Sequence, residues 1–206
     1  QPSTLSAEER KQLGKYTSLL KMVMEAGEEG QLSRQAFGKY NSMLREISHL
    51  LPCWAVTSLS ARGRIPLEPG EFDIVVFDEA SQCDIASAIP LLYRAKSVVI
   101  IGDPNQLSHI SGLQRGQDQA LLERYSLLED FPHRAYSHQS LFSLGSTQVS
   151  GGGIVSLVDH HRSHSDIISF SNEEFYEERL RVATNYDKLR SPNRSEPGIR
   201  WIDIKG

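Results

Sequence analysis

The chain has 206 residues, 39% of them hydrophobic and 23% charged, the composition of an ordinary globular protein with one large domain or one domain and part of another. A net charge of −4 and a pI near 6.0 exclude a strongly basic protein, so charge alone does not predict nucleic-acid binding. No apolar run reaches the roughly 20 residues that cross a bilayer, and the sequence does not begin like a secretory signal, so we expect an intracellular protein without a membrane partner.

The first 50 residues predict a segment of two helices. Ser6-Ala-Glu-Glu9 has the pattern of a capping box, and apolar residues at helical spacing follow to about Glu25. Residues 26 to 30 break this pattern with two glycines, and a second apolar stripe runs from Arg34 to His49. We expect the two stripes to pack as ordinary helix surfaces.

Residues 51 to 58 predict a short strand led by Pro52, and the Gly- and Pro-containing residues 60 to 71 predict a loop. Thr57 and Ser58 lie at the end of the predicted strand. Their hydroxyl and amide groups could contact a nucleic-acid backbone, and a capping or turn role is the alternative.

Two further segments predict neighbouring parallel strands. Residues 74 to 77 form a continuous β-branched and aromatic run, the pattern of a strand covered on both faces, and residues 97 to 101 form a second such run. Residues 85 to 94 are long enough for a short helix between them. The three segments predict a right-handed βαβ unit whose polar turns emerge on one edge of the sheet.

Polar residues follow both predicted strands. Asp78 and Glu79 come directly after the first strand, and Asp103 and Gln106 follow the second, so we expect these four residues to lie close together. Two carboxylates beyond the carboxyl ends of strands suggest a magnesium–nucleotide site, because Mg²⁺ keeps several waters and bridges phosphates. The alternative for the adjacent pair is an acidic helix N-terminus, where carboxylates interact favourably with the helix dipole.

After the second strand, the sequence pattern predicts a helix at 117 to 125 and a Gly-rich connector around 150 to 153. Beyond the connector it predicts a strand at 154 to 158, a helix at 166 to 180 capped by Ser165, and a strand at 199 to 204.

The clustered histidines could bind a metal ion, and the two cysteines could form a disulfide. His160, His161 and His164 are clustered, but no Cys or carboxylate set nearby completes a four-ligand zinc site. Cys53 and Cys83 show no CxxC pairing and are expected to be small buried residues.

Three motifs, in the right order and spacing, resemble those of the superfamily 1 helicases. Asp78-Glu-Ala-Ser-Gln82 is similar to their Walker B motif, and Gly102-Asp-Pro-Asn-Gln-Leu107 is similar to the motif that follows it. Residues 157 to 176, which place Arg162 between a strand and a helix, resemble motif IV. The resemblance covers about residues 51 to 206 and is closest to the Upf-like and Dna2-like group that moves 5′ to 3′.

This resemblance implies an α/β fold of the P-loop NTPase class, with RecA-like parallel sheets. Residues 1–50 would be an accessory helical segment, which could flank a nucleic-acid channel, and residues 51–142 would be part of a first RecA-like domain. Residues 143–153 would be a linker, and residues 154–206 the start of a second RecA-like domain. ATP would lie in the cleft between the two domains.

The resemblance also implies roles for single residues in phosphoryl transfer. Asp78 would hold magnesium through water, Glu79 would orient and polarise the attacking water, and Gln106 would sense the γ-phosphate. Arg162 would enter from the second domain as an arginine finger in cis, so that hydrolysis depends on domain closure.

Further ligand contacts follow from the same resemblance. Gly102 and Asp103 would lie at the nucleotide, and His161 stands where the family often has an aromatic residue that stacks on adenine. The implied ligands are ATP, magnesium and a single strand of DNA or RNA. No Gly-x-x-x-x-Gly-Lys-Ser/Thr phosphate loop occurs in the 206 residues, so we expect a longer polypeptide to supply it and the isolated chain to hydrolyse ATP negligibly.

Two alternatives belong to other functional classes. A non-catalytic RecA-like interaction or scaffold module would have no chemical need for Asp78, Glu79, Gln106 and Arg162 together. Another P-loop phosphotransferase would explain the Walker B motif but neither of the other two.

Overall fold

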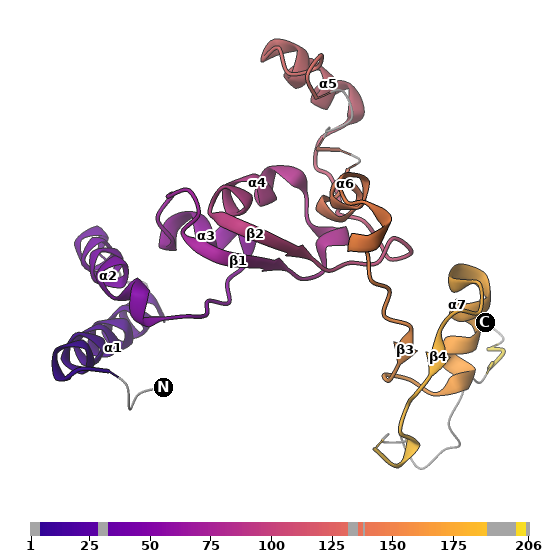
Figure 1. Ribbon diagram of the computed structural model, residues 1–206, viewed down its shortest axis with the longest axis horizontal. Helices are drawn as coiled ribbons and strands as arrows, with labels where there is room; N and C mark the ends of the chain where they lie inside the picture. The colour runs from indigo at the N-terminus through magenta and orange to yellow at the C-terminus, as the bar shows by residue number, and fades with distance from the viewer. Residues whose placement is uncertain (1–4, 29–32, 132–135, 138, 189–200, 205–206) are drawn as a thin grey trace.

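The computed structural model describes residues 5–28, 33–131, 136–137, 139–188 and 201–204. Along the chain it forms a pair of helices, a two-stranded parallel sheet with helices, and a smaller unit of two short strands and a helix, as Figure 1 shows. Among the described residues, no helix combines the length and the apolarity that a bilayer crossing requires.

The helical pair consists of α1 (Ala7–Glu28) and α2 (Arg34–Ile47), followed by the short 3₁₀ helix η2 (Ser48–Leu50). The predicted capping box is present: the Ser6 N–H donates to Glu9 Oε2 at 2.6 Å, and the Glu9 N–H donates to Ser6 Oγ at 3.2 Å. The Tyr16 and Tyr40 rings stack at 5.6 Å and join the two helices. The two-helix prediction is confirmed, with α1 running three residues past Glu25 because an isolated glycine, here Gly27, lowers helix stability without necessarily ending the helix.

The strand predicted for residues 51 to 58 is wrong. Residues 51 to 57 form no strand. Helix α3 (Ser58–Arg64) begins at the last residue of the predicted strand and replaces the first part of the loop predicted at 60 to 71. Thr57 caps this helix, because its side-chain oxygen accepts the Ser60 N–H at 3.3 Å. A strand needs a neighbour for its backbone hydrogen bonds, and in the described part of the chain β1 pairs only with β2.

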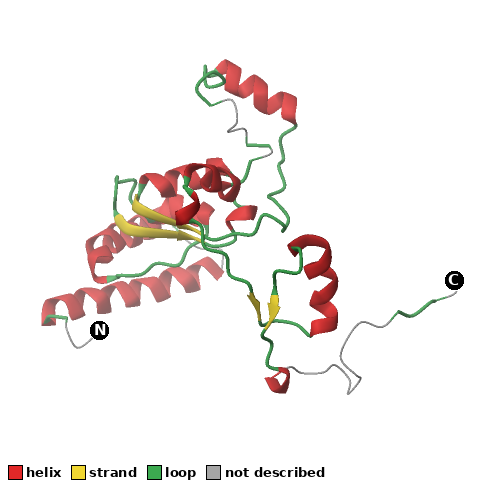
Figure 2. Cartoon of the chain, turned by 45° about the vertical axis from the view of Figure 1, so that its right-hand side comes forward, coloured by secondary structure: helices red, strands yellow, loops and turns green. Residues whose placement is uncertain are grey.

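The central βαβ unit is confirmed. Strand β1 (Phe72–Phe77) pairs in parallel with β2 (Ala95–Ile100), in a register that sets Val75 beside Val98. Helix α4 (Ile85–Tyr93) connects them, and its first turn is capped by Asp84, whose Oδ1 accepts the Ser87 N–H at 2.8 Å. Figure 2 shows the two strands side by side with helices packed beside them. The predicted α/β class is therefore correct.

Only one face of this sheet is covered in the described structure. Phe77 belongs to a core cluster with Ala80, Ala88 and Leu141, against which Val75 and Ile100 also pack. On the opposite face Ile74 is 60% exposed and Val76 is 56% exposed. The prediction that the first strand is covered on both faces is wrong for these residues, because α4 and α6 both supply their contacts to the face of Phe77.

Two helices follow β2. The helix expected at 117 to 125 is present as α5 (Arg115–Arg124). Helix α6 (Leu141–Gln148) occupies the first part of the segment 143–153 that was expected to be a linker. Ser140 and Ser143 form a capping box at the start of α6. Gly145 lies so close to β2 that a Cβ there would stand 2.6 Å from Ile100 Cδ1. Residues 143 to 148 are thus a packed helix, and a short 3₁₀ turn, η4 (Gly151–Gly153), follows.

The last unit consists of two short strands, β3 (Asp159–His160) and β4 (Arg181–Val182), which pair in parallel. Helix α7 (Ser165–Tyr176) connects them, and a 3₁₀ turn, η5 (Tyr186–Lys188), follows β4. The strand predicted at 154 to 158 is therefore displaced: those residues form no strand, and pairing begins at Asp159. The strand predicted at 199 to 204 is absent over 201 to 204, and residues 199 and 200 lie outside the described residues.

Helix α7 differs from its prediction at both ends. His164 rather than Ser165 is the capping residue, and its Nδ1 accepts the Asp166 N–H at 3.3 Å. The helix ends at Tyr176 because Glu177 and Glu178 adopt left-handed backbone angles, with φ of 53° and 58°.

The two cysteines also differ from one another. Cys53 is exposed, so the prediction that it is buried is wrong; it lies in the segment that forms no strand. Cys83 packs against the core cluster. Burial raises the pKa of the Cys83 thiol, as does the neighbouring Asp84 charge.

Candidate functional site

The loops that follow β1 and β2 meet at one edge of the sheet, as predicted. Backbone pairing continues past the strands: the Ile101 N–H donates to Phe77 O at 2.8 Å, and the Ala80 N–H donates to Ile101 O at 2.8 Å. The buried Ser81 hydroxyl then donates to Asp103 O at 2.7 Å and accepts from the Asp103 N–H at 2.8 Å. These bonds fix the loop of Asp78 and Glu79 against the loop that contains Asp103.

Asp78 and Glu79 are both exposed at this edge. Glu79 has a left-handed backbone, with φ of 54° and ψ of 40°, and its N–H donates to Asp78 Oδ1 at 3.1 Å. A residue with a Cβ in this conformation costs roughly 1 to 2 kcal/mol, and such strain gathers at functional sites. The 3₁₀ helix η3 (Ala80–Gln82) follows, with Glu79 at its N-cap position and no hydrogen bond from η3 to the Glu79 side chain. Glu79 thus stands at a short helix N-terminus, as the alternative expected, but it does not cap that helix through its side chain.

Asp103 is the most connected side chain at this edge. Its Oδ1 accepts the Asn105 N–H at 3.0 Å, and its Oδ2 accepts Gln106 Nε2 at 3.0 Å and the Tyr176 hydroxyl at 2.6 Å. Burial raises the pKa of the Asp103 carboxyl, but these hydrogen bonds outweigh burial and leave the pKa below its ordinary value. Burial and the Asp103 contact raise the pKa of Tyr176 to about 12.

Gly102 has a steric reason to be glycine. A Cβ at this position would lie 2.6 Å from a ring carbon of Phe142 and 2.8 Å from Ser81 Oγ. The close approach lets the Gly102 backbone pass between α6 and the Ser81 hydroxyl. Gly102 thus sets the position of the Asp103 loop.

Arg162 lies two residues after β3 and is exposed. Neither acidic neighbour holds it: Asp159 pairs with Arg181 at 2.8 Å, and Asp166 lies 3.6 Å from His164. Among the described residues, no hydrogen bond or ion pair joins Arg162 to Asp78, Glu79 or Gln106. The structure therefore leaves its guanidinium available without bringing it into contact with the sheet edge.

The three neighbouring histidines have separate partners. His160 Nε2 lies 2.7 Å from Ser163 Oγ, His161 Nδ1 lies 3.0 Å from Ala183 O, and the His164 ring lies 4.8 Å from that of Tyr186. Within the described ranges, no group of three or more His, Cys, Asp or Glu side chains is placed to hold a metal ion. His161 remains exposed.

Thr57 and Ser58 lie at the N-terminus of α3, and the Thr57 hydroxyl oxygen is engaged as the helix cap. Neither residue shares a hydrogen bond with the loops after β1 and β2 in the described structure. The capping alternative is therefore the role that the structure shows for Thr57.

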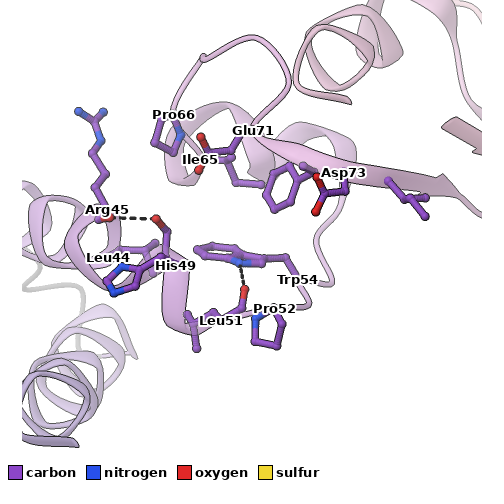
Figure 3. A pocket seen from close by; sticks show the side chains of 13 residues that line it. Leu44, Arg45, His49, Leu51, Pro52, Trp54, Ile65, Pro66, Glu71 and Asp73 are labelled. Carbon is purple, nitrogen blue, oxygen red and sulfur yellow. Dashed lines mark hydrogen bonds between the residues drawn. The ribbon is translucent and has the colours of Figure 1, made fainter. Parts of the chain in front are cut away.

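A pocket of about 540 Å³ lies at the opposite end of β1, between that strand, α2 and the segment after η2. Figure 3 shows Trp54 in this pocket, with its indole Nε1 donating to Leu51 O at 2.9 Å. None of the described residues predicted for the site lines it. The carboxylates and the polar loops identify the other end of the sheet as the candidate site.

Four residues of this edge were not predicted from the sequence: Ser81, Asn105, Phe142 and Tyr176. Ser81 lies inside the Asp78–Gln82 motif, beside the small and fully buried Ala80. The Tyr176 contact spans 73 residues of sequence, and no local pattern reveals it.

The carboxylates at the edge fit a magnesium ion that keeps most of its water. Asp78 uses one oxygen to accept the Glu79 N–H, and no bond from a described residue occupies its other oxygen. Mg²⁺ is usually bound by one or two carboxylates, several waters and substrate phosphates rather than by an all-protein cage. One exposed carboxylate with a second beside it meets that requirement.

Comparisons with known proteins identify relatives of the chain. A family model described as an AAA domain (AAA_11) matches residues 7–110. The uncharacterized ATP-dependent helicase MG140 of Mycoplasma genitalium is 34% identical over 70% of this chain and 12% of its own length. Human probable helicase senataxin is 27% identical over 74% of this chain and 6% of its own length. Helicase SEN1 of Saccharomyces cerevisiae is 31% identical over 58% of this chain and 4% of its own length.

Proposed function

The chain belongs to the AAA domain family, with the α/β fold of a P-loop helicase domain, and we propose that it is part of an ATP-dependent helicase or translocase motor. The relatives' names confirm its resemblance to the superfamily 1 helicases. The chain spans 12% or less of the length of the relatives described above. Activity, substrates and partners of the whole protein are therefore part of the proposal.

The observation that carries the proposal is the Ser81–Asp103 connection. Its two hydrogen bonds, at 2.7 and 2.8 Å, tie the loop with two exposed carboxylates to the loop with Gln106. Hydrolysis of a nucleoside triphosphate requires charge neutralisation and a positioned water near the γ-phosphate. Carboxylate and amide side chains on adjacent loops can meet both needs.

In the proposed reaction, water attacks the γ-phosphorus of ATP and the bond to the β–γ bridging oxygen breaks, giving ADP and phosphate. Glu79 accepts a hydrogen bond from the attacking water and takes its proton as the new bond forms. Asp78 would hold magnesium, and that ion would supply charge neutralisation for the β- and γ-phosphates. The exposure of both carboxylates supports this division, because water can reach each of them.

Gln106 and Arg162 would make hydrolysis depend on how the unit of β1 and β2 is arranged relative to the unit of β3 and β4. Gln106 would donate from its side-chain amide to the γ-phosphate, with Gly102 and Asp103 shaping the loop that carries it. Arg162 would move to the nucleotide when the units close and act as an arginine finger. Its lack of an acidic partner among the described residues supports this role, because a guanidinium already paired with a carboxylate would first have to leave it.

We extend the proposal to the organisation of the motor. Residues 51–142 form part of a first RecA-like domain, residues 154–206 the start of a second, and residues 143–153 the connection between them, which includes most of α6. Residues 1–50 are an accessory helical segment. The phosphate loop and later motifs come from other parts of the same polypeptide, and a single strand of DNA or RNA is the track.

The proposal includes contacts to adenine and to the nucleic-acid backbone. His161 would stack on the adenine, and Thr57 and Ser58 would contact the nucleic-acid backbone. His161 is exposed, as stacking requires. Ser58 is less exposed than Thr57, and the Thr57 hydroxyl oxygen already accepts a hydrogen bond, so a contact from that residue would use its backbone or its hydroxyl proton.

The proposal is tested by measuring phosphate release from ATP in the longest natural protein that contains this chain, with and without single-stranded DNA or RNA. We expect hydrolysis that depends on magnesium and rises when nucleic acid is added. ATP binding without hydrolysis, under both conditions, would favour the scaffold alternative. Hydrolysis that nucleic acid does not change would contradict the motor function.

A further inference from the structure

The end of α7 is joined to the loop after β2 by two hydrogen bonds. The Tyr176 hydroxyl donates to Asp103 Oδ2 at 2.6 Å, and Asn105 Nδ2 donates to Phe175 O at 2.7 Å. Figure 1 shows that α7 belongs to the unit of β3 and β4, apart from the β1–β2 sheet. These bonds therefore connect two units that lie far apart in the sequence.

The same Asp103 oxygen also holds Gln106. Oδ2 accepts Gln106 Nε2 at 3.0 Å, so one carboxylate oxygen receives hydrogen bonds from both Gln106 and Tyr176. An amide NH₂ group has two N–H donors. With one directed at Asp103, the other N–H has a defined direction and is available for a ligand oxygen.

We propose that Tyr176 is a positioning residue for Gln106, which acts through Asp103 and makes the orientation of the Gln106 amide depend on the placement of α7. This inference rests on the proposed function, in which Gln106 contacts the γ-phosphate. When α7 is docked, Asp103 is held by Tyr176 and the Gln106 amide has a fixed direction. When α7 moves away, Asp103 loses that bond and Gln106 loses its fixed direction.

The chemistry of the contact supports this dependence. A hydroxyl that donates to an ionised carboxylate makes a short, charge-assisted hydrogen bond, and 2.6 Å is in that range. Tyr176 is partly buried, whereas Gln106 is exposed and has Asp103 as its side-chain partner among the described residues. The tyrosine is therefore the more fixed of the two donors, and the carboxylate transmits its position.

The first test needs no nucleotide. In the 206-residue chain, the side-chain NH₂ resonances of Gln106 are assigned by NMR with the Gln106→Ala variant and followed in Tyr176→Phe, which removes only the hydroxyl. We expect them to shift and to broaden. The matched control is Tyr186→Phe, whose hydroxyl accepts the Ser165 N–H at 3.3 Å within its own unit; there the Gln106 resonances should not change.

The second test separates positioning from general stability. In the longest natural protein that contains the chain, Tyr176→Phe should lower kcat for ATP hydrolysis about tenfold, the loss expected for one hydrogen bond to a charged group, while KM for ATP stays within about twofold. In a Gln106→Ala background the same substitution should add less than about a further twofold, because both changes remove one function.

The outcomes are distinguishable. Unchanged Gln106 resonances in Tyr176→Phe would overturn the inference whatever the kinetics show. Independent, multiplicative effects of Tyr176→Phe and Gln106→Ala on kcat would also overturn it, because they would make Tyr176 a simple connection between units. Absence of ATP hydrolysis in the unaltered protein would overturn the proposed function, while the resonance test would still decide whether Tyr176 positions Gln106.

Discussion

Ser81 and Asp103 exchange two hydrogen bonds across the sheet edge: the Ser81 hydroxyl donates to Asp103 O at 2.7 Å and accepts from the Asp103 N–H at 2.8 Å. The Ser81 hydroxyl thus pairs with both the backbone N–H and the backbone carbonyl of Asp103, whose side chain organises the loop after β2. Because Ser81 is 5% exposed, water cannot easily replace it. The relation makes this serine the structural link between the two motif loops.

Ser81→Ala should therefore destabilise the chain by about 1 to 3 kcal/mol, the cost of leaving buried polar groups without partners. The measurement is chemical denaturation of the chain. The control is Ser146→Ala, because Ser146 is exposed and its hydroxyl, among the described residues, bonds to Ser143 O in its own helix alone; its effect should stay within about 0.5 kcal/mol. Equal effects of the two substitutions would contradict the proposed importance of the Ser81 link.

Gly102→Ala should also destabilise the chain, since the added methyl group would lie 2.6 Å from Phe142 and 2.8 Å from Ser81 Oγ. Overpacking of this kind typically costs about 1 to 3 kcal/mol. Gly38→Ala should have the opposite sign. Gly38 lies in the interior of α2, a Cβ there meets nothing within 4 Å, and replacing a glycine in a helix interior by alanine gains about 0.5 to 1 kcal/mol. Denaturation midpoints of both variants check the prediction.

The sheet edge shows what sequence patterns can and cannot predict. The β1–β2 pair and its connecting helix follow from two continuous apolar runs and the spacing between them, and the meeting of the Asp78 and Asp103 loops follows from the topology. The predicted strand at 51 to 58 failed because an extended segment becomes a strand only beside a partner. Trp54 instead packs its ring edge-on to Phe72, at 6.4 Å.

The contacts across units lie beyond local patterns for a different reason. Tyr176 reads in the sequence as one more aromatic residue near the end of a helix, and its partner depends on where α7 is placed against the sheet. The left-handed backbone of Glu79 is equally invisible, because glutamate has no preference for that conformation. Both features depend on tertiary contacts.

The Asp103–Tyr176 pair predicts a defined pH dependence of stability. The lowered pKa of Asp103 adds stability that is present above its unfolded pKa, near about 4, and is lost as pH falls through the folded value. The pKa of Tyr176, raised to about 12, adds stability that is complete below the unfolded value of about 10 and is lost as pH rises from there through about 12.

Unfolding experiments with the chain and with Tyr176→Phe between pH 3 and pH 11 check this. The difference in unfolding free energy between the two should be largest from about pH 5 to pH 9, where Asp103 is ionised and Tyr176 neutral. It should shrink toward both ends of the range. A difference that does not change with pH would show that the hydroxyl contributes without the charged partner.

Glu79→Gln should preserve ATP binding and abolish ATP turnover in the longest natural protein that contains the chain, because the amide keeps the shape of the carboxylate but cannot accept the proton of the attacking water. Binding is measured by equilibrium titration with ATP, and turnover by phosphate release. The matched control is Glu71→Gln, an exposed glutamate at the other end of β1 that lines the Trp54 pocket; both quantities should stay unchanged there. Parallel loss of binding and turnover in Glu79→Gln would make Glu79 a structural carboxylate.

Arg162 provides the most direct test of the closure that we propose between the unit of β1 and β2 and the unit of β3 and β4. It is exposed, and its acidic neighbours are engaged elsewhere, Asp159 with Arg181 at 2.8 Å and Asp166 beside His164 at 3.6 Å. A planar guanidinium that is always charged suits the spread charge of a transferring phosphoryl group, and arginine fingers contribute roughly 10³ to 10⁵ in rate. Arg162→Ala should therefore lower nucleic-acid-stimulated ATP hydrolysis by orders of magnitude.

The melting temperature separates this role from a structural one. Because Arg162 makes no ion pair with a described residue, its removal should leave the melting temperature nearly unchanged. Arg181→Ala, which breaks an exposed ion pair of the kind worth about 0 to 1 kcal/mol, should have little effect on either quantity. Arg162→Lys should hydrolyse ATP nearly as slowly as Arg162→Ala, since lysine keeps the positive charge but loses the forked N–H donors of arginine. Near-normal hydrolysis in Arg162→Ala would remove Arg162 from the proposed reaction, and a large fall in melting temperature would assign it a structural role.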